Sequence, residues 1–423
     1  MATEISNAEI MSPAGSFESL NAAIKAGADS VYFGVGKLNM RARSANFEYK
    51  DLGKIAKICK KNNVKSYLAL NTIMYDEDIK LMKRICGKAK KSGIDAVIVS
   101  DIAAMAYARS IGLEVHMSTQ LNISNIEAVR FFSKYADVIV LARELNLRQI
   151  ANISKQIKKE KIKGPGGRIL KIELFCHGAL CVAIAGRCHM SLATYNAPAN
   201  RGACIQNCRR AYKVVDEETG KELVIDNKYV MSPGDLCTIS FLDRIISAGA
   251  SILKIEGRGR APEYAYHVTK VHKDAVKSIE NKSYTKDKIE KWIKDLERVY
   301  NRGFWQGGYY LGKQLGQWSG AFGSKATTKK EYIGKVLNYF NKANVAEIII
   351  ESGTLNRGED IIITGPTTGI VEARAEAMLN GDKNLESAKK NDRITVKIAE
   401  RARKNDKVYV VRKAGTEYNA RHK

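Results

Sequence analysis

The clearest indication of the fold class is residues 65–100, which read KSYLALNTIMYDEDIKLMKRICGKAKKSGIDAVIVS. The two ends of this stretch, KSYLALN (65–71) and AVIVS (96–100), are short apolar runs typical of buried strands. Between them, residues 76–92 have the apolar spacing of an amphipathic helix. A strand, a helix and a second strand in this order predict a parallel βα unit of an α/β fold.

The same alternation continues on both sides of this stretch. Short apolar runs predict further strands at 30–34 (SVYFG), 115–118 and 137–141 (DVIVL). Amphipathic spacing predicts further helices at 17–26 and 126–135. Repeated βα units of this kind favour a (β/α) TIM-barrel-like domain.

Polar residues stand where several predicted strands end. Asn71, Gln120, Arg143 and Glu144 follow early strands, and Glu256 lies at the end of a later one. In a (β/α) barrel these positions form the C-terminal rim, where ligands bind. Arg143, Glu144 and Glu256 are therefore candidates to bind a small molecule, and Arg143 suits an anionic dicarboxylate. The ordinary polarity of βα loops is the alternative interpretation.

An echo within the sequence predicts the domain organisation. Met11-Ser12-Pro13 and Met231-Ser232-Pro233 each precede a helical pattern, an Ala-Gly-Ala turn and an apolar run. The echo predicts a barrel over residues 1–280, interrupted by a Cys-rich insertion at about 164–229. Residues 281–330 read as a helical segment followed by a linker rich in Gly and aromatic residues.

The last part of the chain, residues 331–423, has a different sequence pattern. Short alternating runs such as VAEIIIES (345–352) and DKVYVVRK (406–413) are separated by Gly, Asn and Asp. This pattern predicts a small C-terminal β-barrel. It also resembles the second-domain barrel of translation elongation factors, an analogy that favours contact with RNA.

The chain is strongly basic, with a formal net charge of +25 from 70 Lys and Arg against 45 Asp and Glu. A charge of this size favours polyanionic partners such as nucleic acid. Heavy use of Lys on solvated surfaces is the alternative. No apolar run is long enough to cross a bilayer, and residues 1–9 lack the features of a signal peptide. We therefore expect a cytoplasmic protein with no membrane partner.

Six of the eight cysteines crowd into one short part of the chain. In a reducing compartment such clustering indicates metal or redox chemistry before it indicates disulfides. The irregular intervals between them favour an iron–sulfur cluster, although thiolates also bind zinc. The six are Cys176, Cys181, Cys188, Cys204, Cys208 and Cys237.

Residues 173–191, which read ELFCHGALCVAIAGRCHMS, resemble the signature of peptidase family U32, the collagenase-like peptidases. Three other segments also look like family segments: residues 12–34 (SPAGSFESLNAAIKAGADSVYFG), 201–214 (RGACIQNCRRAYKV) and 254–266 (KIEGRGRAPEYAY). The chain is therefore identified as a member of this family over nearly its whole length.

The resemblance implies an oxygen-independent hydroxylation enzyme that carries a 4Fe–4S cluster. Family members act in ubiquinone synthesis, on ribosomal RNA, or on tRNA, where the wobble uridine becomes 5-hydroxyuridine with prephenate as co-substrate. The basic charge and the β-rich tail favour RNA as the substrate, and a second family member is a candidate partner. The family's cluster ligands map onto Cys181, Cys188, Cys204 and Cys237, with Cys208 as the substitute if one of these is misassigned.

Several arginines near the cysteines, or after a predicted strand, are candidates to bind RNA phosphates. Pairing with local carboxylates is the alternative. The aromatic residues of 304–310 suit either base stacking or the sealing of a domain boundary. The candidate arginines are Arg201, Arg209, Arg210, Arg258 and Arg260.

A peptidase is the alternative function, together with hydroxylation of ribosomal RNA. The sequence contains neither H-E-x-x-H nor G-x-S-x-G. Six histidines make a Cys–His pair arithmetically available. A thiolate that binds a cluster cannot also act as a nucleophile, so the two functions compete for the same cysteines. No catalytic residue is assigned from the sequence.

Overall fold

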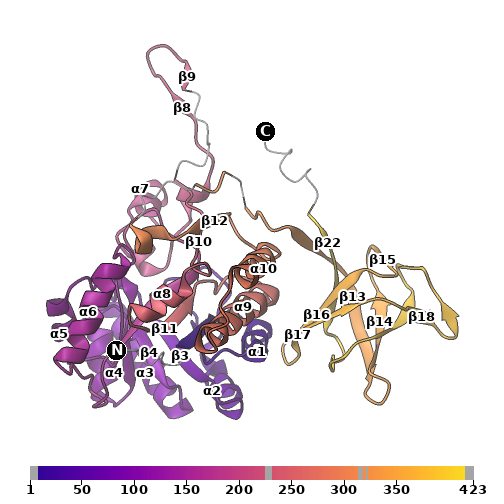
Figure 1. Cartoon of the computed structure of the whole chain (residues 1–423), viewed down its shortest axis with the longest axis horizontal. Helices are drawn as coiled ribbons and strands as arrows, with labels where there is room; N and C mark the ends of the chain where they lie inside the picture. Colours follow the sequence, from indigo (N-terminus) through magenta and orange to yellow (C-terminus); the bar gives the residue numbers. More distant parts are fainter. Residues whose placement is uncertain (1–7, 224–230, 313–317, 321–322, 415–423) are drawn as a thin grey trace.

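The chain forms two bodies that lie side by side, a larger α/β part and a smaller β part (Figure 1). Residues 1–7 and 415–423, which the predicted domains include, lie outside the described residues. This computed structural model describes residues 8–223, 231–312, 318–320 and 323–414.

The N-terminal part is a closed parallel barrel, as the βα alternation predicted. Its strands follow one another in chain order, and the last strand pairs with both the first and the seventh, which closes the barrel. The barrel strands are β1 (Glu9–Pro13), β2 (Ser30–Phe33), β3 (Lys65–Leu70), β4 (Ala96–Val99), β5 (Glu114–Met117), β6 (Val138–Val140), β7 (Lys171–Gly178) and β11 (Ala250–Ile255).

Helices cover the outside of the barrel (Figure 1). Four of them begin at a polar N-cap, where Ser16, Asp101, Asn125 or Asn146 accepts a hydrogen bond from a first-turn N–H group. Among the described residues, no helix is both long and apolar enough to cross a membrane. The barrel helices are α1 (Phe17–Lys25), η1 (Tyr49–Asp51), α2 (Leu52–Lys61), α3 (Asp76–Ser92), α4 (Ile102–Ser110), η2 (Thr119–Leu121), α5 (Ile126–Phe132), α6 (Leu147–Lys159), α8 (Leu242–Ser247) and α9 (Pro262–Glu280).

The barrel interior is not purely apolar. The helices pack on the outer faces of the strands to form one large hydrophobic core. Inside the barrel, residues such as Met11, Tyr67 and Ile98 form a second, smaller apolar group. Two charged side chains, Glu173 and Lys254, are buried at 0% and 5% exposure. Buried charges are costly unless paired, so their position inside the barrel indicates a role.

The Cys-rich insertion begins later than predicted. Residues 171–178 fall inside the predicted insertion at 164–229, but they form β7, which pairs in parallel with β6 and β11. The insertion instead follows Gly178, and its hairpin β8–β9 projects away from the barrel (Figure 1). Its elements are α7 (Met190–Tyr195), η3 (Ala199–Arg201), η4 (Asn207–Arg209), β8 (Val214–Val215), β9 (Glu222–Leu223) and β10 (Asp235–Cys237).

The segment that echoes the N-terminus does not reopen the barrel directly. β10 follows the second Met-Ser-Pro motif and pairs antiparallel with β7, with Cys237 opposite His177. On its other side, β10 pairs in parallel with β12 (Phe304–Gln306). The barrel therefore resumes only at β11, after α8.

The linker region contains helix α10 (Lys286–Glu297), β12 and the short helix η5 (Gly308–Leu311). Trp305 is 1% exposed, and the Tyr310 hydroxyl donates a 2.9 Å hydrogen bond to the Phe175 carbonyl. These aromatic residues therefore seal the linker against the barrel and are not free to stack on bases.

The C-terminal part is an antiparallel β-domain around its own hydrophobic core, as predicted. Its main sheet has the order β17-β16-β22-β13-β14-β21-β18-β19, and among the described residues the two edge strands do not pair with each other. Its strands are β13 (Thr328–Phe340), β14 (Val345–Ile350), β15 (Thr354–Asn356), β16 (Asp360–Gly365), β17 (Gly369–Arg374), β18 (Leu379–Asn380), β19 (Lys383–Asn384), β20 (Ser387–Lys389), β21 (Arg393–Lys397) and β22 (Lys407–Lys413).

The β-domain packs against the barrel through α1 and α9. Ala22 of α1 forms an apolar contact with Ile362 and Ile370 of the β-domain. Across the same boundary, His267 lies 2.9 Å from a Glu372 carboxylate oxygen. Gly369 allows the close approach, since a Cβ there would lie 2.7 Å from the Ala22 nitrogen.

Candidate functional site

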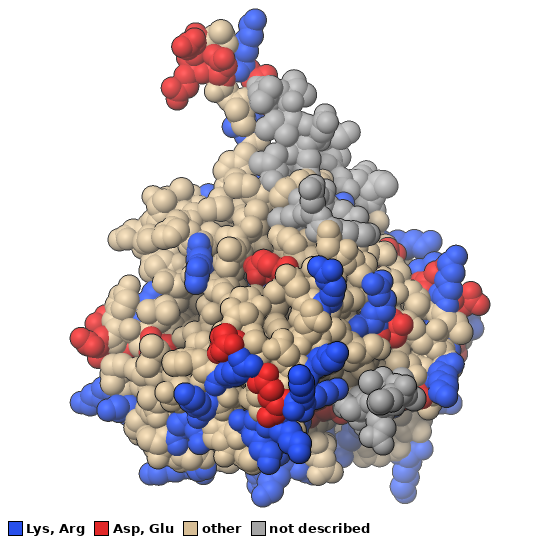
Figure 2. Space-filling model, turned by 60° about the vertical axis from the view of Figure 1, so that its left-hand side comes forward, with Lys and Arg blue, Asp and Glu red and all other residues tan. Residues whose placement is uncertain are grey.

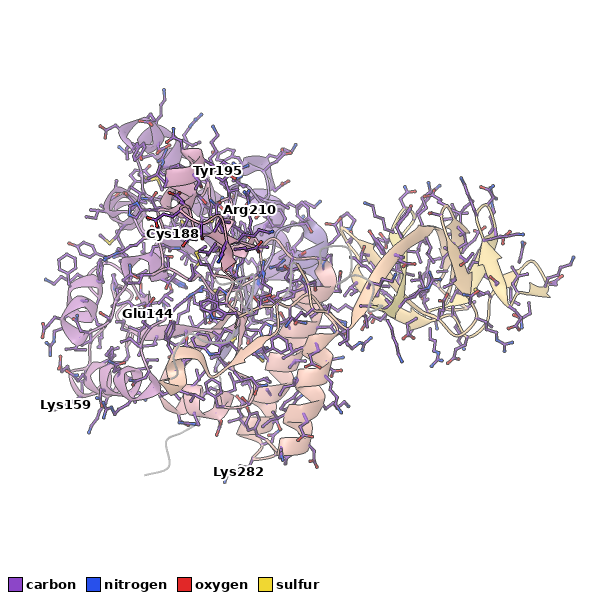
Figure 3. The ribbon with its side chains drawn as sticks, turned by 90° about the horizontal axis from the view of Figure 1, so that it is seen from above. Glu144, Lys159, Cys188, Tyr195, Arg210 and Lys282 are labelled. Carbon is purple, nitrogen blue, oxygen red and sulfur yellow. The ribbon has the colours of Figure 1, made fainter. Side chains whose placement is uncertain are left out.

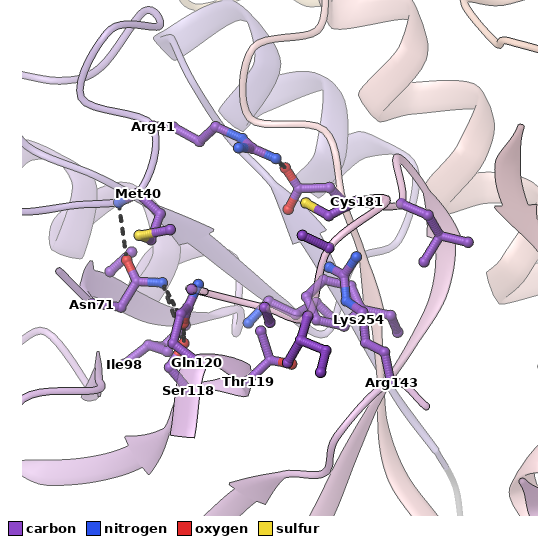
Figure 4. Close-up of a pocket in the computed structure, with 18 of the residues that line it drawn as sticks. Met40, Arg41, Asn71, Ile98, Ser118, Thr119, Gln120, Arg143, Cys181 and Lys254 are labelled. Atoms are coloured by element: carbon purple, nitrogen blue, oxygen red, sulfur yellow. Dashed lines mark hydrogen bonds and ion pairs between the residues drawn. The ribbon is translucent and has the colours of Figure 1, made fainter. Parts of the chain in front are cut away.

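A pocket opens at the C-terminal rim of the barrel, beneath the start of the insertion (Figure 4). The four polar residues predicted at strand ends all line it: Asn71, Gln120, Arg143 and Glu144. Asn71 links the strands, because its side chain accepts from the Met40 N–H at 3.2 Å and donates to Ser118 at 3.2 Å. The insertion contributes residues 180–186, which include Cys181.

Glu256 is held at the end of β11 by two partners. Its Oε1 accepts hydrogen bonds from Arg41 at 2.9 and 3.1 Å, and its Oε2 accepts one from the Tyr32 hydroxyl at 3.0 Å. Burial alone raises the pKa of this carboxyl, but Arg41, Arg258 and Arg143 outweigh burial and lower the pKa from 4.5 to about 2. Glu256 is therefore an anion whose charge is already satisfied by protein groups.

This lowered pKa predicts an acid-sensitive contribution to stability. The folded-state pKa lies below the unfolded value, so the Glu256 carboxylate stabilises the fold above about pH 4.5. That contribution, at most about 3 kcal/mol, is lost as the pH falls toward 2. We expect Glu256→Gln to lower the melting temperature at neutral pH and to flatten its fall between pH 4.5 and 2.

Thermal denaturation followed by circular dichroism across this pH range measures the effect. The control is Glu290→Gln on α10, whose carboxylate is 58% exposed. A Glu256→Gln curve parallel to the wild-type curve over the whole acidic range would contradict the assignment.

Arg143 lies flat against the wall of the pocket. Its guanidinium carbon is 3.7 Å from the centre of the Phe175 ring, and its Nη1 donates to the Ala179 carbonyl at 3.2 Å. Its Nε is buried without a hydrogen-bond partner among the described residues. The guanidinium therefore keeps donor capacity for a bound anion. Glu144, the neighbouring candidate, is exposed at the same rim.

Three further cationic side chains line the pocket, and sequence reasoning missed two of them as pocket residues: Arg41 and Lys254. Arg258, which was predicted for RNA, is 4% exposed and donates to the Asn39 side chain at 3.0 Å. Against these cations the pocket presents the carboxylates of Glu144 and Glu256. The excess of positive charge suits a ligand that carries more than one carboxylate.

Three cysteines of the insertion, Cys181, Cys188 and Cys204, lie within electrostatic reach of a fourth, Cys208. Burial raises the pKa of the Cys208 thiol, Arg209 lowers it, and the thiolates of Cys181, Cys204 and Cys188 raise it further. Cys181 is exposed, and Cys188, Cys204 and Cys208 are partly buried. The structure therefore brings Cys208 together with three of the four predicted ligands.

Cys237, predicted as the fourth ligand, is buried, whereas Cys181 is exposed. Cys237 is 1% exposed on β10, and burial raises its pKa to about 12. Its thiol neighbour is Cys176 on β7, whose pKa is raised by burial and by Cys237. The antiparallel pairing of β10 with β7 brings Cys237 to the strand that carries Cys176.

The thiols of Cys181, Cys188, Cys204 and Cys208 are the donor type that binds iron–sulfur clusters. Among the described residues, no three Cys, His, Asp or Glu side chains converge closely enough to hold one ion. A cube needs less convergence, since each thiolate binds a different iron. Arg209 lies close enough to Cys208 and Cys181 for their thiolates to raise its pKa, although burial lowers it more. A cation beside thiolates favours their ionised, metal-binding form.

Three of the five arginines predicted to bind RNA are committed to the fold: Arg258 in the pocket, Arg201 and Arg209. Arg201 forms an ion pair with Asp78, donates to the Ile73 carbonyl at 2.9 Å and covers the Tyr75 ring at 3.8 Å. Arg209 donates to the Pro233 carbonyl at 2.7 Å and to the Leu180 carbonyl. Both anchor the insertion to its surroundings.

The remaining two lie nearer to solvent. Arg260 stacks on the Tyr300 ring at 3.5 Å, close to the boundary with the β-domain. Arg210 is exposed and hydrogen-bonds to the Tyr195 hydroxyl; both residues are labelled in Figure 3. Basic side chains on the face in Figure 2 are spread among acidic ones and do not form one continuous patch. Arg210 is thus the predicted arginine best placed to meet a polyanion near the cysteines.

Comparison with known proteins gives a consistent result. The model of peptidase family U32 matches residues 15–320, which span the barrel, the insertion and the linker. A collagenase of Porphyromonas gingivalis is 52% identical over 96% of this chain and 98% of its own length.

Two relatives have names that refer to RNA. A tRNA hydroxylation protein of Bacillus subtilis is 28% identical over 85% of this chain and 83% of its own length. The 23S rRNA 5-hydroxycytidine synthase of Escherichia coli is 33% identical over 64% of this chain and 39% of its own length. The relatives are thus named for two kinds of chemistry, the cleavage of collagen and the hydroxylation of RNA.

Proposed function

Because this chain belongs to peptidase family U32, we propose that it is an RNA-modifying enzyme that hydroxylates the wobble uridine of tRNA to 5-hydroxyuridine. The reaction is oxygen-independent, uses prephenate as co-substrate and requires a 4Fe–4S cluster. The single observation that carries the proposal is the rim pocket, where the thiol of Cys181 and the guanidinium groups of Arg41 and Arg143 face one cavity.

The pocket supports a dicarboxylic acid as co-substrate. Prephenate carries two carboxylates and a ketone. Arg143 offers free donor capacity on one wall, and Arg258 has a buried Nε without a partner among the described residues. Charge-assisted hydrogen bonds from two guanidinium groups would orient such an acid. Glu256 leaves these guanidinium groups available to the ligand, because its own charge is paired with Arg41.

Cys181, Cys188, Cys204 and Cys208 would hold the cluster at the roof of this pocket. When bound, the cluster supplies one-electron transfer. Arg41 and Arg209 lie near Cys181, and the thiolate raises the pKa of the Arg41 guanidinium after the larger effect of Glu256. These arginines would offset the negative charge of thiolate ligands.

RNA would approach from the insertion side. Arg210 and Tyr195 are exposed on the insertion and hydrogen-bond to each other. An exposed ring and a guanidinium suit an unpaired base and its phosphate. The net charge of +25 supports a polyanionic substrate in general. The relatives named for tRNA and for ribosomal RNA support RNA as the class.

A peptidase is the second candidate, favoured by the 52% identity to a relative named collagenase. Its chemistry needs a thiol activated by an imidazole. In the part of the chain described, no histidine nitrogen hydrogen-bonds to a cysteine sulfur. His177 and His272 lie near Cys176, but burial lowers the pKa of both, and that of His272 falls to about 4. The geometry therefore supports the RNA function better.

The deciding experiment is nucleoside mass spectrometry of RNA from a host that lacks its own tRNA hydroxylation proteins. Expression of this chain is expected to produce 5-hydroxyuridine in tRNA, and only in cells that make prephenate. Ribosomal RNA is analysed in parallel for 5-hydroxycytidine, and the purified chain is assayed on gelatin. Gelatin cleavage that disappears in Cys181→Ala, with unchanged RNA nucleosides, would establish the peptidase instead.

A further inference from the structure

A lysine stands inside the barrel, directly beneath the rim pocket. Lys254 lies near the C-terminal end of β11, is 5% exposed and lines the pocket (Figure 4). Its Nζ lies 4.6 Å from the centre of the Tyr32 ring and 5.4 Å from that of Phe175. Lysine is rarely buried unless it is paired or functional. The amine is thus confined by aromatic walls and meets whatever enters the pocket.

A carboxylate within hydrogen-bond distance can take a proton from this lysine. The Lys254 Nζ lies 2.7 Å from Oε1 of Glu173, which is fully buried on β7. The other oxygen, Oε2, has no hydrogen-bond partner among the described residues. The ring of His116, also fully buried, lies 3.9 Å from this Oε2. Glu173 therefore has an open site for a proton beside the amine.

The residues around Lys254 would bring a carbonyl group to it. The Arg143 guanidinium and the Lys254 amine both lie over the Phe175 ring. A carboxylate bound to Arg143 would therefore lie next to the amine. Arg258 approaches the Tyr32 ring that Lys254 also faces. In a 2-oxo acid the ketone is bonded to the carboxyl carbon. An acid held by these guanidinium groups would therefore present its ketone to the lysine.

We propose that Lys254 forms a Schiff base with the ketone of a 2-oxo acid bound in the rim pocket. This inference rests on the proposed acid-binding function of the same pocket and assigns it a covalent step. Lysines in desolvated pockets are suited to this chemistry.

The step is balanced in atoms and charge. The Lys254 ammonium gives one proton to the Glu173 carboxylate, and the neutral amine attacks the ketone carbon to form a carbinolamine. The new C–N bond becomes a double bond as the C–O bond breaks. The oxygen leaves as water, which takes one proton from Glu173 and one from the nitrogen. The product is a protonated imine on Lys254, and Glu173 is again a carboxylate. No oxidant or reductant is consumed.

Borohydride trapping tests the step. The full-length protein is incubated with prephenate and sodium borohydride, digested, and the modified lysines are located by peptide mass spectrometry. Chorismate is the matched control ligand, because it is an isomer of prephenate with two carboxylates and no ketone. Lys254→Arg is the matched variant, since it keeps the positive charge beside Glu173 but cannot form an imine.

We expect a reduced adduct on the peptide that contains Lys254, at least about tenfold above any surface lysine. The adduct is absent with chorismate and absent in Lys254→Arg. Trapping that is equal at surface lysines, or an unmodified Lys254 in protein that hydroxylates RNA, overturns the inference but leaves the proposed function standing. An adduct on Lys254 in protein that leaves RNA unmodified supports the inference and removes the RNA function. The wild-type result decides the matter even where Lys254→Arg fails to fold.

Discussion

Replacing Cys208 by serine is expected to abolish iron–sulfur loading, whereas the same replacement of Cys237 is expected to leave it intact. Cys208 shares its surroundings with Cys181, Cys188 and Cys204, and the thiolates of all three raise its pKa. Cys237 is buried on β10 next to Cys176, with its pKa raised to about 12.

Iron and acid-labile sulfide per chain, measured after anaerobic purification, test this expectation together with an absorption spectrum. Wild type and Cys237→Ser should each contain about four of both and show the broad charge-transfer band. Cys208→Ser should lose most of the iron and the band, because an oxygen ligand binds iron in a cube less well than a thiolate.

Cys59→Ser is the matched control for the loss of a buried thiol. Cys59 lies on α2, and burial raises its pKa to about 12. The opposite result, with iron lost in Cys237→Ser and kept in Cys208→Ser, would restore the ligand set predicted from the family pattern. It would also mean that β10 rearranges when the cluster binds. Tightly bound zinc in place of iron would remove the cluster from the proposed function.

The barrel could be predicted from sequence because each of its parts carries a local signal. Residues 76–92 were predicted as a helix and form α3 over the same residues. The runs at 65–71 and 96–100 form β3 and β4, each shortened at its end. Parallel strands that are buried on both sides appear in the sequence as continuous apolar runs. Such runs can be recognised without knowing which strands pair with each other.

The start of the insertion and the fourth thiol could not be predicted in the same way. β7 follows directly on residues 164–170, so composition alone did not separate the strand from the insertion. Cys204 and Cys237 are far apart in sequence, and only the antiparallel pairing of β10 with β7 brings Cys237 near Cys176. Long-range strand pairing is not encoded in local spacing.

The rim of the pocket was predicted, but its interior was not. Asn71, Gln120 and Arg143 follow strands, and barrel geometry places such residues at one end. Lys254 left one signal that was overlooked, a charged residue in the middle of the apolar run ILKIEG at 252–257. A lysine at an inward position of a buried strand is unusual enough to mark a site.

Arg143→Met is expected to lower kcat/KM for the acid co-substrate by about 100-fold or more in the RNA hydroxylation assay. Methionine keeps the apolar contact with Phe175 but removes the charge and every N–H donor. The loss should appear mainly in KM for prephenate, because the guanidinium binds a carboxylate that does not itself react. Stability should change little, since the only protein group that Arg143 donates to is the Ala179 carbonyl among the contacts described.

Arg148→Met is the matched control, because Arg148 is an exposed residue of the neighbouring helix α6 and does not line the pocket. It removes the same charge from the same βα unit, so it separates binding at the rim from the general attraction of the basic surface for RNA. Equal losses in the two variants would show that Arg143 acts through the overall charge. A loss confined to Arg143→Met, with the cluster content unchanged, would place the acid in the rim pocket rather than at the cysteines, and the pocket and the cluster would then be two separable parts of one site.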